Sequence, residues 1–272
     1  MNEARGEAVL DRAVTLAQEA WGPRLVAAYA LGSLAHGGFS DLVSDVDLGL
    51  VLAAPLTADD AARVAALGAR VRAGGAPLAE RLSVFWGSAA TLRGEGALGR
   101  FPPLDRLDLA RHGRLLAGRD CRDGLPIPTT RELVVAAAAQ ALRSLAAPAV
   151  VAELDDPDGL VAAGARHLTK RILFPVRFIY TAQTGAIGRN PDAVAHFVAT
   201  ETGPMADLAA AALRWRETPP EQDRATSVRI VAAGIKPLYR HFVADHERRL
   251  HDYDEPELAQ GFAAWRAALS AA

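Results

Sequence analysis

Two short apolar runs, each flanked by polar residues, constrain the fold of this chain more than any other feature. The first run, residues 25–31, leads into Gly32-Ser33, and the second, residues 46–52, follows Asp45 and contains Asp47. Strand side chains alternate between two faces, so Asp45 and Asp47 should point to the same face. Two carboxylates this close repel each other, and a divalent cation removes that repulsion.

The Gly32-Ser33 turn complements the two acids. A tight turn after a strand exposes backbone N–H groups, which suit a phosphate. Eleven residues separate Ser33 from Asp45, and we expect a short helix over 34–38 and a loop over 39–44. Metal-binding carboxylates beside a phosphate-binding turn predict chemistry on a nucleoside triphosphate.

The remaining patterns predict two domains of different class. Up to residue 120 the sequence mixes strands and helices, and after a proline-containing linker at 123–129 we find only helical patterns. We predict an α/β domain with a small mixed sheet over 1–125 and an all-α helical bundle over 126–272, with the active site in the cleft between them. The expected strands are 25–30, 46–52, 81–86 and 114–118; the expected helices are 7–20, 57–72, 107–112, 130–145, 159–184, 191–200, 204–216, 220–246 and 256–271.

Composition limits the partners and the location. The net charge of −2 gives no broad basic surface for long nucleic acid and leaves open only a local basic groove, so we expect no nucleic-acid partner. No apolar stretch approaches the ~20 residues of a membrane span. The N-terminal residues lack the apolar core of a signal peptide, so we expect a cytoplasmic protein that does not enter a membrane.

Other reactive side chains suggest little further chemistry. The one cysteine, Cys121, excludes an internal disulfide and a cysteine-based zinc site, and we expect a partly buried thiol. The histidines near the end of the chain stand among charged residues, so we expect them on a polar helix face and not at a metal. They are His241, His246 and His251.

Gly32-Ser33 followed by Ser44-Asp45-Val46-Asp47-Leu48 resembles the signature of the DNA polymerase β-like nucleotidyltransferase superfamily. Within it, the chain is most similar to the streptomycin/spectinomycin (aminoglycoside) adenylyltransferases. Their C-terminal helical domain contains a segment like residues 177–187, which begin with Arg177 and include Thr184-Gly185. The resemblance implies a nucleotidyltransferase fold, ATP as the donor and two Mg²⁺ ions. The residues it implies are Asp45 and Asp47 as metal ligands, and Gly32, Ser33, Ser44, Arg177 and Arg189 as nucleotide contacts.

The chain departs from that family at the third carboxylate, which acts there as a metal ligand or general base. Ser83 occupies the matching position, and a serine is not a base at neutral pH without help. Glu80 is the nearest acid and our candidate catalytic residue beside Asp45 and Asp47, although an ideal strand would turn it to the other face. Glu95 and Asp105 are looser substitutes, and His167 stands where an acid that contacts the acceptor would be expected.

These patterns favour a Mg²⁺-dependent enzyme that transfers AMP from ATP to a hydroxyl of a small molecule, with an aminoglycoside-like acceptor as the first candidate. The missing third carboxylate leaves open a catalytically weakened nucleotide-binding or regulatory protein. A third possibility is nucleotidylation of a protein or a tRNA, and the absence of a broad basic surface argues against RNA.

Overall fold

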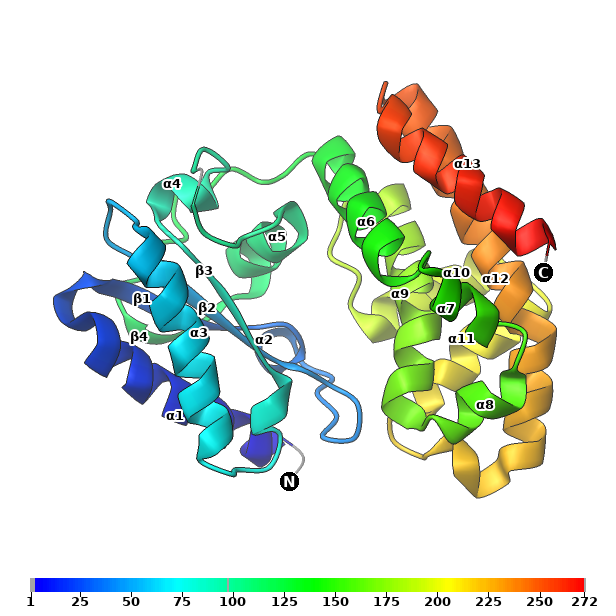
Figure 1. The fold of residues 1–272 in the computed structure, drawn as a ribbon, viewed down its shortest axis with the longest axis horizontal. Coiled ribbons are helices and arrows are strands. Elements are labelled where there is room, and N and C mark those ends of the chain that lie inside the picture. The colour runs from blue at the N-terminus through cyan, green and yellow to red at the C-terminus, as the bar shows by residue number, and fades with distance from the viewer. Residues whose placement is uncertain (1–2, 97, 272) are drawn as a thin grey trace. The chain divides into compact units, whose positions relative to one another are not determined.

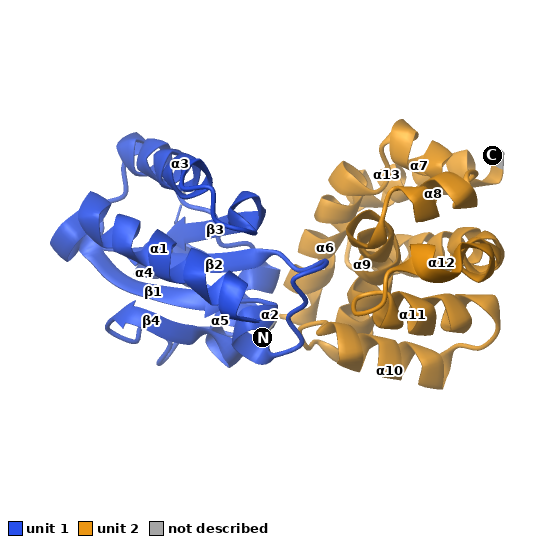
Figure 2. Cartoon of the chain, turned by 90° about the horizontal axis from the view of Figure 1, so that it is seen from below, with its two compact units in different colours: residues 1–128 blue, residues 129–272 orange. Residues whose placement is uncertain are grey.

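The computed structural model describes residues 3–96 and 98–271. The chain divides into two compact units, residues 1–128 and 129–272 (Figure 2). The first unit mixes strands and helices, and the described part of the second is helical. The fold class predicted from the sequence is therefore confirmed.

A four-stranded sheet forms the centre of the first unit (Figure 1). The strands lie within one residue of the predicted ranges at each end: β1 (Leu25–Leu31), β2 (Val46–Leu52), β3 (Leu82–Gly87) and β4 (Arg114–Gly118). Their order is β3-β2-β1-β4. β1 runs antiparallel to β2 and β4, whereas β2 and β3 run parallel, so the sheet is mixed.

Helices cover both faces of this sheet because its strands are apolar on both sides. Ala30 and Leu48 lie on the face that packs against α1 (Glu3–Trp21) and α3 (Ala58–Ala73). Tyr29 and Phe85 lie on the opposite face, with residues of α4 (Ala89–Leu92) and α5 (Pro103–His112). The short α2 (Ser33–His36) follows β1 directly. Asp47 and Ser83 lie two residues from Gly49 and Phe85, so they share the face covered by α5.

α3 connects the parallel strands β2 and β3, a connection that requires a crossover. Asp60 in its first turn is completely buried, and its carboxylate accepts hydrogen bonds from Trp21 Nε1, Arg24 and the Thr57 amide. The Arg24 guanidinium, bonded to this carboxylate, holds the pKa of Asp60 well below its usual range. One buried acid thus ties α1, η1 (Gly22–Arg24) and the start of α3 together.

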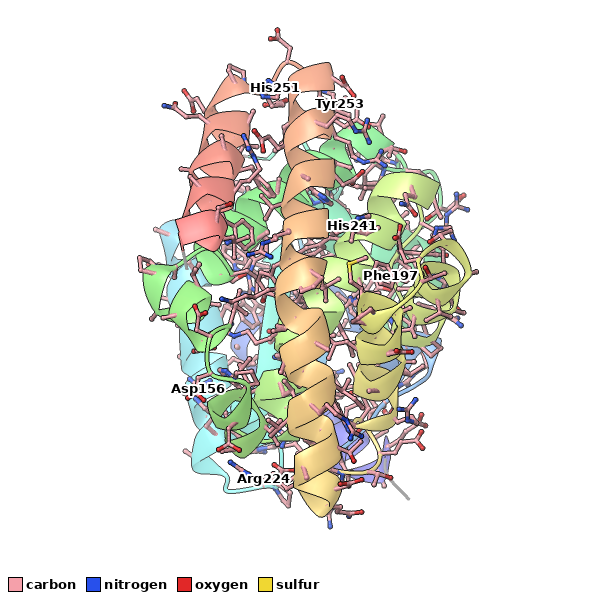
Figure 3. The ribbon with its side chains drawn as sticks, turned by 90° about the vertical axis from the view of Figure 1, so that its right-hand side faces the viewer. Asp156, Phe197, Arg224, His241, His251 and Tyr253 are labelled. Atoms are coloured by element: carbon pink, nitrogen blue, oxygen red, sulfur yellow. The ribbon has the colours of Figure 1, made fainter. Side chains whose placement is uncertain are left out.

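The second unit packs its helices around the long α12, which contacts α9, α11 and α13. Figure 3 shows α12 running from Arg224 at one end of the unit toward His251 and Tyr253 at the other. Its buried residues, such as Tyr239 and Phe242, supply part of the core. The helices are α6 (Thr130–Ser144), α7 (Pro148–Glu153), α8 (Pro157–Ala162), α9 (Ala165–Thr184), α10 (Asn190–Thr200), α11 (Pro204–Arg214), α12 (Arg224–Asp252) and α13 (Pro256–Ala271).

Three helical predictions for this unit were wrong in detail. The helix expected over 159–184 is interrupted at Gly164, whose φ of +90° lies outside the helical region. The helix expected over 220–246 begins as a 3₁₀ turn, η3 (Pro220–Asp223), and then continues through Pro237 to Asp252. His246 is completely buried and does not lie on a polar face.

In the described ranges, no helix has the length and apolar character that crossing a bilayer would require.

Candidate active site

The sheet brings the turn and the acids of the sequence motif to one end. In the β1–β2 ladder Leu31 pairs with Asp47, so the residue that follows Leu31 lies beside the start of β2. In the β2–β3 ladder Asp47 lies opposite Ser83. Because β2 and β3 are parallel, both begin at this end. Gly32, just after β1, and Ser83 on β3 therefore lie on either side of Asp47 on β2.

Gly32 forms a turn that only glycine can occupy. Its φ is +60° and its ψ is −148°, a conformation that L side chains avoid. A Cβ on Gly32 would lie 2.4 Å from Asp47 Oδ2, so the turn also needs the missing side chain for space. The Gly32 carbonyl accepts the amides of Ala35 and His36, which starts α2 at Ser33. The first amides of a helix have no intrahelical acceptor, so they can bind an anion.

Asp108 is a site residue that the sequence reasoning missed. The Gly32 amide donates to Asp108 Oδ2 at 2.6 Å, a short hydrogen bond to a carboxylate from α5. Asp108 is only 6% exposed, and its Oδ1 has no hydrogen-bond partner among the described residues. The sequence offered one signal for Asp108: it stands between Leu107 and Leu109 in a predicted helix. Acids are seldom buried unless a partner requires them, so a buried acid there would merit attention.

Ser44 and Asp45 are placed by the loop that precedes β2. Ser44 is buried and its hydroxyl accepts the Ser40 amide at 3.0 Å, which closes the loop on itself. Arg81 reaches across to the same loop and donates to the Asp41 carbonyl at 2.8 Å. Asp45, at the end of this loop, is half-buried. The phosphate-bordering role of Ser44 stays a prediction, and the contacts shown here are structural.

No described residue replaces the third carboxylate in the sheet. Ser83 lies beside Asp47, where the resemblance placed it. Glu80 lies in η2 (Ala79–Arg81) just before β3, with a side chain 65% exposed and 3.4 Å from Arg81. Glu95 pairs with Arg93. Among the described residues, no three acidic, histidine or cysteine side chains are grouped closely enough to hold a metal. Glu80 as the general base therefore stays a prediction.

The carboxylates of Asp45 and Asp47 could hold Mg²⁺ together with the phosphates of a bound polyphosphate. The structure offers Asp45 and Asp47 at the sheet end, and among the described residues these two belong to no group of three acidic, histidine or cysteine side chains that could hold a metal. Mg²⁺ is commonly held by one or two carboxylates together with substrate phosphates and water. Two carboxylates satisfy that arrangement, whereas a cage made of protein ligands alone would need more.

The predicted basic residues lie in the second unit. Arg177 on α9 donates through Nε to the Gly188 carbonyl. Arg189 pairs with Asp192 at 2.7 Å beside the start of α10. Burial and the charge of nearby Arg177 lower the pKa of Arg216, which follows α11. Arg177 and Arg216 are thus close enough for their charges to interact, and Glu217 acts on Arg216 in the opposite sense. Arg216 was not identified from the sequence.

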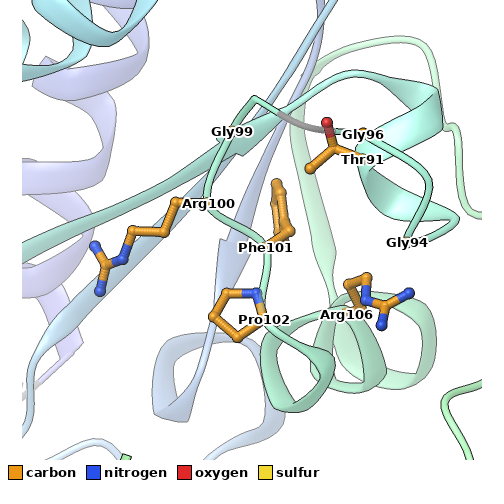
Figure 4. Close-up of a pocket in the computed structure, with 8 residues that line it drawn as sticks. All are labelled: Thr91, Gly94, Gly96, Gly99, Arg100, Phe101, Pro102 and Arg106. Atoms are coloured by element: carbon orange, nitrogen blue, oxygen red, sulfur yellow. The ribbon is translucent and has the colours of Figure 1, made fainter. Parts of the chain in front are cut away.

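Two further features contain none of the predicted metal or nucleotide contacts. A cavity of about 380 Å³ lies between the loop after α4 and the start of α5 (Figure 4). Its lining includes Phe101 and Arg106 but none of the predicted site residues, and Figure 4 shows Arg100 and Arg106 pointing in opposite directions. His167, expected near the acceptor, lies 3.0 Å from Glu153 in the second unit.

Comparison with known proteins identifies a common fold. No model of a protein family matches this chain, and no curated protein matches it. Among solved structures, the chain is similar to the spectinomycin adenyltransferase AAD(9) of Enterococcus faecialis, solved with ATP and spectinomycin. The TM-score is 0.53 at 14% sequence identity, over 83% of this chain and 97% of that chain. The chain therefore shares the fold of that adenyltransferase, a small mixed-sheet domain followed by a helical region.

Proposed function

We propose that this chain is a Mg²⁺-dependent nucleotidyltransferase that transfers AMP from ATP to a hydroxyl of a small molecule. The observation that carries the proposal is the Gly32 turn, seated against the Asp47 carboxylate at the end of the sheet. A phosphate-binding turn in contact with a metal-binding acid is what a metal–triphosphate complex requires. The common fold with an adenyltransferase solved with ATP supports the same reaction.

In this mechanism the protein positions the triphosphate and neutralises its charge. Asp45 and Asp47 would hold Mg²⁺, which when bound offsets the negative charge of the phosphates and of the departing pyrophosphate. Ser33 and the amides that follow Gly32 would contact phosphate oxygens, because the Gly32 amide itself donates to Asp108. Arg177 and Arg189 would supply basic contacts to the nucleotide.

The chemical step is an in-line displacement. The acceptor hydroxyl oxygen forms a bond to the α-phosphorus, the bond from that phosphorus to the bridging oxygen breaks, and pyrophosphate leaves. The hydroxyl proton passes to the Glu80 carboxylate, which is exposed at the start of β3. An aminoglycoside-like acceptor is the first candidate because the structurally similar adenyltransferase was solved with spectinomycin.

The test is pyrophosphate release from ATP and Mg²⁺ with a panel of aminocyclitols and aminoglycosides. Asp47→Asn should lower the rate at least about 100-fold, since metal stabilisation of the transition state contributes several kcal/mol. Asp41→Asn is the matched control. Asp41 lies in the loop before β2, and its carboxylate pairs with Arg5. If the wild-type protein does not bind ATP with Mg²⁺, the proposal is wrong.

Ser83 favours a second candidate, a nucleotide-binding or regulatory protein without efficient transfer. Its neighbour Asp47 has no acid opposite it on β3, and Glu80 is engaged by Arg81. This alternative predicts saturable ATP binding without pyrophosphate release for any acceptor. Transfer of label from α-³²P-ATP that depends on Asp47 would exclude it, and a labelled protein or RNA band in lysate would instead identify a macromolecular acceptor.

A further inference from the structure

We infer that Asp108 is a positioning residue for the phosphate-binding turn. The inference rests on the proposed function, because it assigns Asp108 a role in seating the same triphosphate. Asp108 belongs to α5, which is separate in sequence from the Gly32 turn and from the acids of β2. It has no counterpart among the residues that the sequence motif identifies.

Asp108 and Asp47 lie against Gly32 on two sides, and Asp108 binds its amide. The Gly32 amide donates to Asp108 Oδ2 at 2.6 Å, and the α-carbon side of Gly32 lies against Asp47 Oδ2. The hydrogen bond from the Gly32 amide fixes the direction of a turn whose φ of +60° is intrinsically unfavourable for most residues. Because the turn contacts Asp47, fixing the turn also fixes the space in which the Asp47 carboxylate can sit.

The burial of Asp108 shows that this contact is costly to maintain. Asp108 is 6% exposed, and its Oδ1 lacks a hydrogen-bond donor within the described residues. No ion pair of a described cation with Asp108 compensates its charge. An acid without a partner on one oxygen is disfavoured in a protein interior unless the other oxygen serves a purpose. Within the described residues, the one hydrogen bond to the Asp108 side chain comes from the Gly32 amide.

A positioning role differs from a metal-binding one. No three described acids around Asp47 form a cluster that could hold a cation, and Asp108 directs one carboxylate oxygen to the Gly32 amide. Its hydrogen bond needs an acceptor oxygen and does not need a charge. An asparagine oxygen can accept the same amide, so Asp108→Asn should preserve the turn and Asp108→Ala should release it.

The experiment compares both variants with a second buried acid of the same unit. Asp60→Asn removes the charge of a completely buried carboxylate that lies in the first turn of α3, after the opposite end of β2. Binding of ATP is titrated calorimetrically over a range of Mg²⁺ concentrations, and each variant is unfolded in urea. We expect Asp108→Ala to raise the Kd for ATP at least tenfold and to raise the half-saturating Mg²⁺ concentration. Asp108→Asn should stay within threefold of wild type, and Asp60→Asn should lose stability without a change in Kd.

The amide signal of Gly32 gives a readout without nucleotide. In wild type this proton should resonate far downfield and exchange slowly, and Asp108→Ala should abolish both properties. The inference is overturned if Asp108→Ala binds ATP like wild type, if Asp60→Asn weakens binding equally, or if the Gly32 signal does not change. Failure of wild type to bind ATP overturns the proposed function and this inference with it, whereas the other results overturn the inference alone.

Discussion

Replacing Gly32 by alanine should separate Asp47 from the phosphate-binding turn. The added Cβ would lie 2.4 Å from Asp47 Oδ2, closer than a carbon and an oxygen can approach without a bond. Either the carboxylate rotates away or the turn moves. In both cases the acid and the turn no longer present one surface to the triphosphate.

Two separate effects act in this variant, one on stability and one on nucleotide binding. The backbone strain of alanine in this conformation costs about 1–3 kcal/mol of unfolding free energy. If the Asp47 carboxylate moves away from the bound Mg²⁺–triphosphate, the binding free energy of ATP decreases by about 1.5–3 kcal/mol. The Kd for ATP with Mg²⁺ should therefore rise about 10- to 150-fold.

Gly37→Ala is the matched control because it introduces backbone strain while its new Cβ contacts no other residue. Gly37 has a φ of +87°, and nothing lies within 4 Å of a Cβ built there. Both variants should therefore lose stability in urea titrations, and only Gly32→Ala should lose nucleotide affinity by isothermal calorimetry. Equal Kd values for the two variants would refute the contact between the turn and Asp47.

Two further predictions concern buried titratable groups. Asp60→Ala should lower the free energy of unfolding by about 3 kcal/mol, because it strands the Arg24 charge and the Trp21 donor. The depressed pKa of Asp60 means that wild type has this stability above about pH 4 and loses it as pH falls, so urea titrations at pH 7 and pH 3 should differ less in the variant. Burial lowers the pKa of His246, with Asp245 and Arg249 beside it, so the unfolded chain takes up a proton below about pH 6.5 before the folded chain does. Wild type should lose stability between pH 7 and pH 5, and His246→Phe should flatten that slope; an unchanged slope would contradict the assignment.

The sheet and the motif could be predicted because local pattern determines both. The apolar runs at β1 and β2 are short and bounded by turn residues, and the spacing of Asp45 and Asp47 is fixed by strand geometry. The contact of Gly32 with Asp47 then follows from the antiparallel pairing of Leu31 with Asp47. The metal and nucleotide roles of these residues remain predictions, since they depend on ligands.

What the sequence did not reveal depends on tertiary position. Asp108 reaches Gly32 across 76 residues of chain, and no local pattern encodes that hydrogen bond. His246 looked polar because its neighbours in sequence are charged. It is buried because it stands four residues from both Phe242 and Leu250, which are buried on the same helix face. Gly164 was missed because the helical pattern resumes on both sides of it.

The pairing of Leu31 with Asp47 has a consequence for the stretch of chain that joins them. The pairing of β1 with β2 holds the two ends of this stretch together. The position of the Gly32 turn relative to Asp47 therefore does not depend on how many residues lie between them. Doubling a flexible connection costs only about 0.6 kcal/mol. The exposed Gly37-Gly38 pair is therefore a place where extra residues, an epitope or a reporter could be inserted while the geometry at the strand ends is preserved.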